Sequence, residues 1–134
     1  MVCTGDPDPT FTETNIPWVT RVIPDDRQSG YALANRVYNI DHHKRVAVIR
    51  ANNRYGRVGI MHFNKTGTRL GFPIIIEERF ADGATSFTEE IERMKKSKPD
   101  AIVMWGNPKE LGLILKELRK MDMNQPVYCC DRVV

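Results

Sequence analysis

Five short apolar runs divide this chain at near-regular intervals, and they cover residues 18–23, 46–51, 74–77, 101–105 and 127–130. The stretches between them carry apolar residues at steps of three and four, which is the spacing of helices that cover a sheet. The resulting β-α-β-α order predicts a doubly wound α/β fold with a mostly parallel, five-stranded sheet and helices on both faces. The central strands are expected at residues 46–49 and 101–104, which are uniformly apolar.

The clearest amphipathic helix is expected after Asn107 and Pro108, which suit the N-cap and first position of a helix. Its apolar stripe predicts a buried face, made by the following residues: Leu111, Ile114, Leu115 and Leu118.

Ligands of open parallel sheets bind at the carboxyl ends of the strands, so the loops there are the first place to look for a site. Three such loops carry suggestive residues, at 52–56, 105–108 and 130–132. Asp131 could receive an ammonium group, or it could be a solvated loop carboxylate. Tyr55 and Trp105 could form the wall of a small-molecule cleft, or they could pack at the end of the sheet. Their presence on successive loops favours a shared ligand site.

Length and charge limit the number of domains and the kinds of partner that the chain can have. The 134 residues fit one domain. A net charge of +3 arises from 20 basic and 17 acidic residues that are mixed along the chain, so no nucleic-acid surface is predicted. No apolar run approaches the roughly 20 residues of a membrane helix, and residues 1–3 resemble the end of an apolar strand. We therefore expect no membrane insertion, and we expect the chain to be part of a longer protein.

The sequence predicts neither an enzyme nor a metal or cofactor site. It has no phosphate-binding glycine motif, no nucleophile elbow and no H-E-x-x-H motif. His42 and His43 stand where a helix end favours cations, and His62 falls within a predicted helix. The 3 cysteines form no C-x-x-C pair and are expected to be small core residues.

Several segments, in this order, resemble the type I periplasmic binding proteins, most closely the substrate-binding proteins of branched-chain amino acid ABC transporters. They are Trp18-Val19-Thr20-Arg21 through Gln28, then Arg45 to Ile49 with Tyr55-Gly56, then Asp82-Gly83, Lys98-Pro99-Asp100, and Gln125-Pro126-Val127. The resemblance covers nearly the whole chain. It implies that residues 17–134 form one solute-binding lobe of a two-lobe clamp, and that residues 1–16 are an inter-lobe connector with a remnant of the other lobe.

The resemblance also implies a ligand site between the lobes. Tyr55 falls on the aromatic ligand contact of the family, Asp131 on the acidic residue that receives the α-ammonium, and Trp105 with Gly106 on the loop that lines the same wall. Gly5 and Asp6 fall on the loop that holds the α-carboxylate with small and hydroxyl residues. The sequence departs from the family there, because Asp6 repels a carboxylate and Pro7 has no N–H to donate.

The function implied is a non-enzymatic lobe, periplasmic or extracellular, that delivers an amino acid, an amide or a related small polar solute to an ABC permease. The expected partners are that solute, the permease and the first lobe of the same protein. The alternative is a ligand-sensing domain of a receptor or regulator with the same fold. A small α/β enzyme is disfavoured because no nucleophile, base and orienting group can be assembled from the loops.

Overall fold

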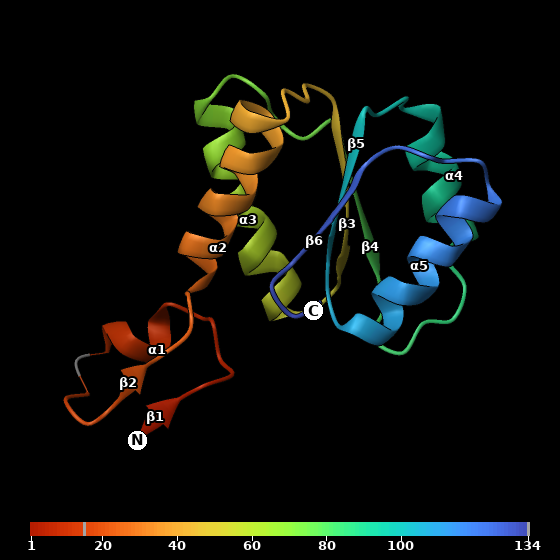
Figure 1. The fold of residues 1–134 in the computed structure, drawn as a ribbon. Coiled ribbons are helices and arrows are strands. Elements are labelled where there is room, and N and C mark those ends of the chain that lie inside the picture. Colours follow the sequence, from red (N-terminus) through yellow and green to blue (C-terminus); the bar gives the residue numbers. More distant parts are fainter. Residues whose placement is uncertain (15, 134) are drawn as a thin grey trace.

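Four parallel strands form the main sheet of the computed structural model, which describes residues 1–14 and 16–133 (Figure 1). In sheet order they are β4 (Ile76–Phe80), β3 (Val46–Ala51), β5 (Ala101–Trp105) and β6 (Val127–Cys129). Every residue of β3 and β5 is buried, and all are apolar except Arg50, whose side chain pairs with Glu77 of β4. This composition is typical of central strands. The predicted α/β class and the predicted central strands are therefore confirmed.

Helices cover both faces of this sheet (Figure 1). One face carries α2 (Asp26–Ala34), its π-helical continuation η1 (Asn35–Ile40) and α3 (Arg54–Arg69), and the other carries α4 (Thr88–Lys96) and α5 (Pro108–Lys120). This is the doubly wound arrangement expected from the alternating pattern. Within the described ranges, no helix combines the length and the apolar composition needed to cross a membrane.

The first apolar run differs from its prediction as a fifth strand of the main sheet. It contributes β2 (Thr20–Arg21), which pairs in parallel with β1 (Val2–Cys3) in a separate two-stranded sheet. The short helix α1 (Thr10–Glu13) connects these strands, and the three elements form an N-terminal unit at the carboxyl edge of the main sheet (Figure 1). Trp18 and Val22, which flank β2, are 72% and 61% exposed despite their apolar side chains.

The predicted apolar stripe of α5 is buried except at one position. Leu111, Ile114 and Leu118 are at most 1% exposed, whereas Leu115 is 36% exposed, which corrects its prediction as a core residue. Successive residues of a helix are rotated by about 100° around its axis, and this rotation places Leu115 at the border of the apolar stripe. The other three residues form the centre of the stripe and face the sheet. The helix is therefore packed through a narrower face than the sequence pattern indicated.

Candidate functional site

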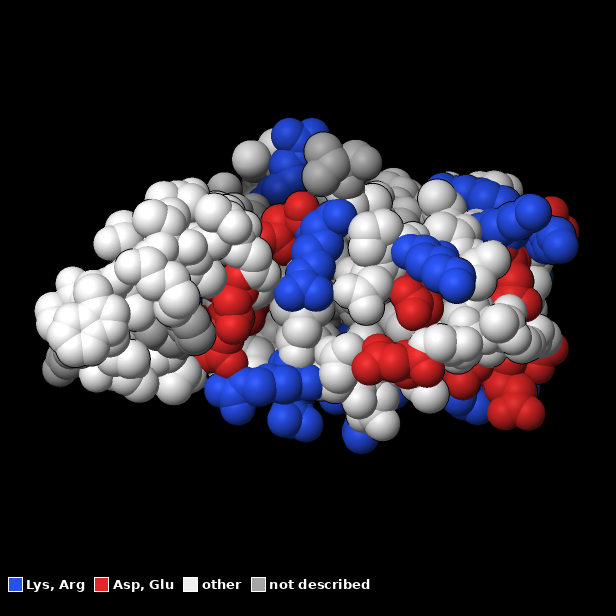
Figure 2. All heavy atoms as spheres, turned by 90° about the horizontal axis from the view of Figure 1, so that it is seen from below, with Lys and Arg blue, Asp and Glu red and all other residues white. Residues whose placement is uncertain are grey.

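The carboxyl ends of β3, β5 and β6 meet the N-terminal unit, and the candidate site lies at this junction. Seen from below, acidic and basic side chains gather together between the N-terminal unit and the rest of the molecule (Figure 2). The predicted site residues come from three loops of the main sheet and from the segment after β1. The structure therefore brings sequence-distant polar groups to one edge.

Tyr55 and Asp131 are in direct contact. Tyr55 lies in the first turn of α3, where the Asn53 side chain accepts a hydrogen bond from the Gly56 N–H at 2.9 Å. Its hydroxyl donates to Oδ1 of Asp131 at 3.0 Å. Burial raises the pKa of Tyr55, and the neighbouring Cys130 and Asp131 add to this effect, so the hydroxyl stays protonated and acts as a donor.

Trp105 packs beside Tyr55 and has no exposed surface. The two ring centroids are 6.0 Å apart with an interplanar angle of 53°. The indole lies so close to Gly59 of α3 that a Cβ there would be 2.2 Å from Trp105 Cε2. Trp105 therefore sets how closely α3 can approach the sheet.

Gly106 contributes to the site through its backbone, which closely approaches neighbouring residues. It is buried, its carbonyl accepts a hydrogen bond from Cys130 Sγ at 3.3 Å, and a Cβ at this position would be 2.9 Å from the Phe80 ring. The missing side chain leaves room for the Phe80 ring at the end of β4.

Gly5 and Asp6 border two different small cavities that both contain Pro7 and Arg132. The Asp26 cavity, about 250 Å³, is lined by Asp6, Pro7, Asp8, Asp26, Arg54, Tyr55 and Arg132. The Gly5 cavity, about 270 Å³, is lined by Thr4, Gly5, Pro7, Ile23, Pro24, Asp131 and Arg132. Asp6 itself is exposed, and its Oδ1 accepts a hydrogen bond from the Asp8 N–H at 3.0 Å.

Asp26 is a functional candidate that the sequence reasoning missed. It is 1% exposed, and its Oδ1 has no hydrogen-bond partner among the described residues. Burial raises its pKa to about 6, and the nearby carboxylates of Asp131 and Asp8 act in the same direction. Asp25 provides the cap of α2 by accepting from the Gln28 N–H at 2.9 Å, which leaves Asp26 to face the cavity.

Arg54 and Asp8 were also missed, and they attach the N-terminal unit to α3. Their side chains form an ion pair, and Arg54 donates a second hydrogen bond to Thr10 Oγ1 at 3.4 Å. The hydrogen bond from Arg54 lowers the pKa of Asp8 to about 2, although partial burial opposes this shift. A basic residue after Asn53 and an acidic residue in a turn give no sequence signal for this contact.

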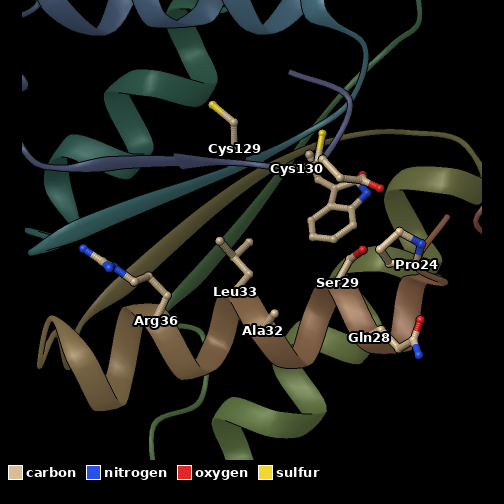
Figure 3. A pocket seen from close by; sticks show the side chains of 10 residues that line it. Pro24, Gln28, Ser29, Ala32, Leu33, Arg36, Cys129 and Cys130 are labelled. Carbon is tan, nitrogen blue, oxygen red and sulfur yellow. The ribbon is translucent and has the colours of Figure 1, made fainter. Parts of the chain in front are cut away.

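A larger, mainly apolar cavity of about 630 Å³ lies between α2 and β6 (Figure 3). Pro24, Ala32 and Leu33 form its helix side, and Cys129 and Cys130 form its strand side, with Trp105 and Asp131 completing the wall. Arg36 lies at the end away from Pro24 (Figure 3). Asp131 thus borders both this apolar cavity and the smaller Gly5 cavity, which also contains Arg132.

Comparison with known proteins identifies the family. A family model described as periplasmic binding protein matches residues 3–130. An amino acid binding protein from Pseudomonas aeruginosa is 23% identical over 131 residues, which cover 97% of this chain and 35% of that relative.

Solved structures show the same architecture. A leucine binding protein, LivK, from Thermotoga maritima superposes with a TM-score of 0.89 at 25% identity, covering 96% of this chain and 37% of that protein. The branched-chain amino acid transporter substrate binding protein LivJ from Streptococcus pneumoniae, in complex with isoleucine, gives 0.82 at 24% identity, covering 91% and 34%. The chain thus spans about a third of the length of these relatives. The resemblance seen in the sequence is confirmed, and the chain belongs to the periplasmic binding proteins of type I.

Proposed function

We propose that this chain is the solute-binding lobe of an extracytoplasmic protein that captures an amino acid with an apolar side chain and delivers it to an ABC transporter. The observation that carries this proposal is the position of Asp131. It accepts a hydrogen bond from Tyr55 and borders both the large apolar cavity and the Gly5 cavity, which also contains the basic side chain of Arg132, at the carboxyl edge of the sheet. The relatives named as amino acid, leucine and branched-chain amino acid binding proteins support the solute class.

Asp131 has the chemistry to receive the ammonium group. Its side chain is exposed at the junction, and Tyr55 occupies only one of its two carboxylate oxygens, Oδ1. A carboxylate that accepts from an ammonium makes a charge-assisted hydrogen bond, which is about twice as strong as a neutral one. The Tyr55 hydroxyl would hold this carboxylate in place while the solute binds.

The apolar cavity has the chemistry to receive an aliphatic side chain. Pro24, Ala32 and Leu33 line it within the same cavity that Asp131 borders. An amino acid bound through its ammonium at Asp131 could therefore place a leucine-like or isoleucine-like side chain against apolar atoms. That burial would add about 0.8 kcal/mol for each CH₂ group removed from water.

A single lobe supplies only one wall of a clamp, so we expect weak binding by residues 1–134 alone. Most of the contacts with the solute, and the closure that excludes water, would come from the second lobe. The expected dissociation constant of this chain for isoleucine or leucine is about 1–10 mM, that is, a binding free energy of about −4 to −3 kcal/mol.

NMR titration of the isotope-labelled chain with isoleucine, leucine and lysine tests the proposal at millimolar concentrations. We expect saturable shifts of the backbone amides of Tyr55 and Asp131 with the two apolar amino acids, and weaker ones with lysine. The absence of any saturable shift at tens of millimolar would contradict the proposed amino acid site. Micromolar affinity would show instead that the site is complete in this chain and that the two-lobe interpretation is wrong.

A further inference from the structure

Arg132 lies at the centre of the candidate site. It lines both the Asp26 cavity and the Gly5 cavity, which between them contain Gly5, Asp6, Tyr55 and Asp131. Sequence reasoning assigned no role to Arg132 beyond its place in the loop after the last strand. In the structure, Arg132 is the basic residue that lines both cavities.

The guanidinium is held in a defined position. Its Cζ lies 3.8 Å from the centroid of the Tyr55 ring, and one Nη donates to Asn107 Oδ1 at 3.2 Å. A guanidinium has five N–H donors, so several remain for a ligand. Arg132 makes no ion pair with any carboxylate of the described residues, whereas the other arginine of the Asp26 cavity, Arg54, is paired with Asp8.

The segment after β1 is poorly suited to bind a carboxylate. Asp6 carries a negative charge there, and Pro7 lacks an N–H. The buried carboxyl of Asp26 adds a further acidic group to the same cavity. A carboxylate that enters this site therefore needs a cationic partner from another segment.

We propose that Arg132 receives the carboxylate of the solute, in place of the loop at residues 4–7, and thereby selects α-amino acids over amides and amines. This inference rests on the proposed function, because it assigns the ammonium of the solute to Asp131 and its carboxylate to the neighbouring Arg132. Asp131 contacts the hydroxyl end of Tyr55, and Arg132 lies over the ring of the same side chain. The negative charge of Asp131 and the positive charge of Arg132 thus lie beside the same Tyr55 side chain, and they are complementary to the neighbouring ammonium and carboxylate of a zwitterionic amino acid. A guanidinium can bind a carboxylate through two parallel N–H donors.

The test compares isoleucine with isoleucinamide, which keeps the ammonium and the side chain but has no carboxylate. Both are titrated by NMR at pH 7 into the parent chain, Arg132→Gln, Arg132→Lys and the control Arg69→Gln. Arg69 ends α3 about 21 Å along the helix from Tyr55, so its loss removes the same charge away from the site. Dispersed amide spectra of each variant show that it is folded.

We expect the parent to bind isoleucine more tightly than isoleucinamide. Arg132→Gln should weaken isoleucine binding about tenfold and change isoleucinamide binding little, because only the carboxylate loses its charged partner. Arg132→Lys should restore part of the preference, and Arg69→Gln should match the parent.

Two results would overturn the inference. If isoleucine binds but Arg132→Gln keeps the parent's preference over isoleucinamide, Arg132 is not the carboxylate partner and the proposed function stands without it. If neither compound binds the parent at all, the proposed amino acid site fails and this inference fails with it.

Discussion

The Tyr55 hydroxyl donates to Oδ1 of Asp131 at 3.0 Å and so joins the first turn of α3 to the loop after β6. These residues are separated by 76 positions in the chain, and both follow strands that end at the same edge of the sheet. The contact fixes the orientation of the Asp131 carboxylate. Substitution of Asp131 therefore tests the role of its charge, and substitution of Tyr55 tests the role of the hydrogen bond that orients the carboxylate.

Asp131→Asn should weaken isoleucine binding about tenfold, because the amide keeps the shape and can still accept from Tyr55 but loses the charge that attracts an ammonium. Tyr55→Phe should weaken binding less, by roughly two- to fivefold, since it removes only the positioning hydrogen bond. NMR titrations of the two variants check the order. Equal affinities of Asp131→Asn and the parent would rule out the ammonium role.

Asp26→Asn should change the pH dependence of stability. The pKa of Asp26 is about 6 in the folded chain against an ordinary value of 3.8, so the folded state holds the proton more tightly than the unfolded state. Its contribution to stability is therefore fully present below pH ~4 and is lost as the pH rises through ~6, by at most about 3 kcal/mol. The amide that replaces the carboxyl in Asp26→Asn has no proton to lose.

Urea unfolding of the parent and Asp26→Asn at pH 4, 5, 6 and 7 measures this difference. We expect the variant to gain about 1–3 kcal/mol relative to the parent between pH 4 and pH 7. Glu92→Gln, at an exposed position of α4, serves as a control whose difference from its parent should stay nearly constant. A pH-independent difference for Asp26→Asn would contradict the raised pKa.

Gly59→Ala should destabilise the chain by about 1–3 kcal/mol, because the new Cβ would lie 2.2 Å from Cε2 of the buried Trp105 and would force the helix away from the sheet. Gly112→Ala is the matched change in α5, where no atom lies within 4 Å of the added Cβ. It should stabilise the chain by roughly 0.5–1 kcal/mol through helix propensity.

Urea unfolding in a Trp18→Phe background measures the stability of both glycine variants through Trp105 fluorescence. Stabilisation of Gly59→Ala by the same amount as Gly112→Ala would show that helix propensity, and not the contact with Trp105, controls the effect.

Leu118→Ala should cost about 2–5 kcal/mol of unfolding free energy, since the side chain is completely buried against the sheet. Leu115→Ala, on the same helix but 36% exposed, should cost less than about 1 kcal/mol. Urea unfolding of the two variants compares the faces directly. A larger loss for Leu115→Ala would mean that α5 packs through a different face.

Local sequence patterns predicted most of the secondary structure. The apolar runs at 46–51 and 101–105 coincide with β3 and β5, because strands covered on both faces are built mainly from apolar residues. The helix after Pro108 begins where its N-terminal residues indicate. The same patterns place Tyr55 and Asp131 after strands, and parallel strands bring such loops to one edge.

Pairing partners and charge contacts were decided by the tertiary structure. The run at 18–23 reads as a strand, but its composition carries no information on whether it joins the main sheet or pairs with Val2–Cys3. The environments of Asp26 and Arg132 depend on segments more than 70 positions away, which meet only when the chain closes. Sequence by itself determined which residues are apolar and where helices and strands can form, since these follow from local periodicity. Only the tertiary structure decided which charged side chains lie close to one another, because electrostatic contacts depend on burial and on distances between residues that are far apart in the sequence.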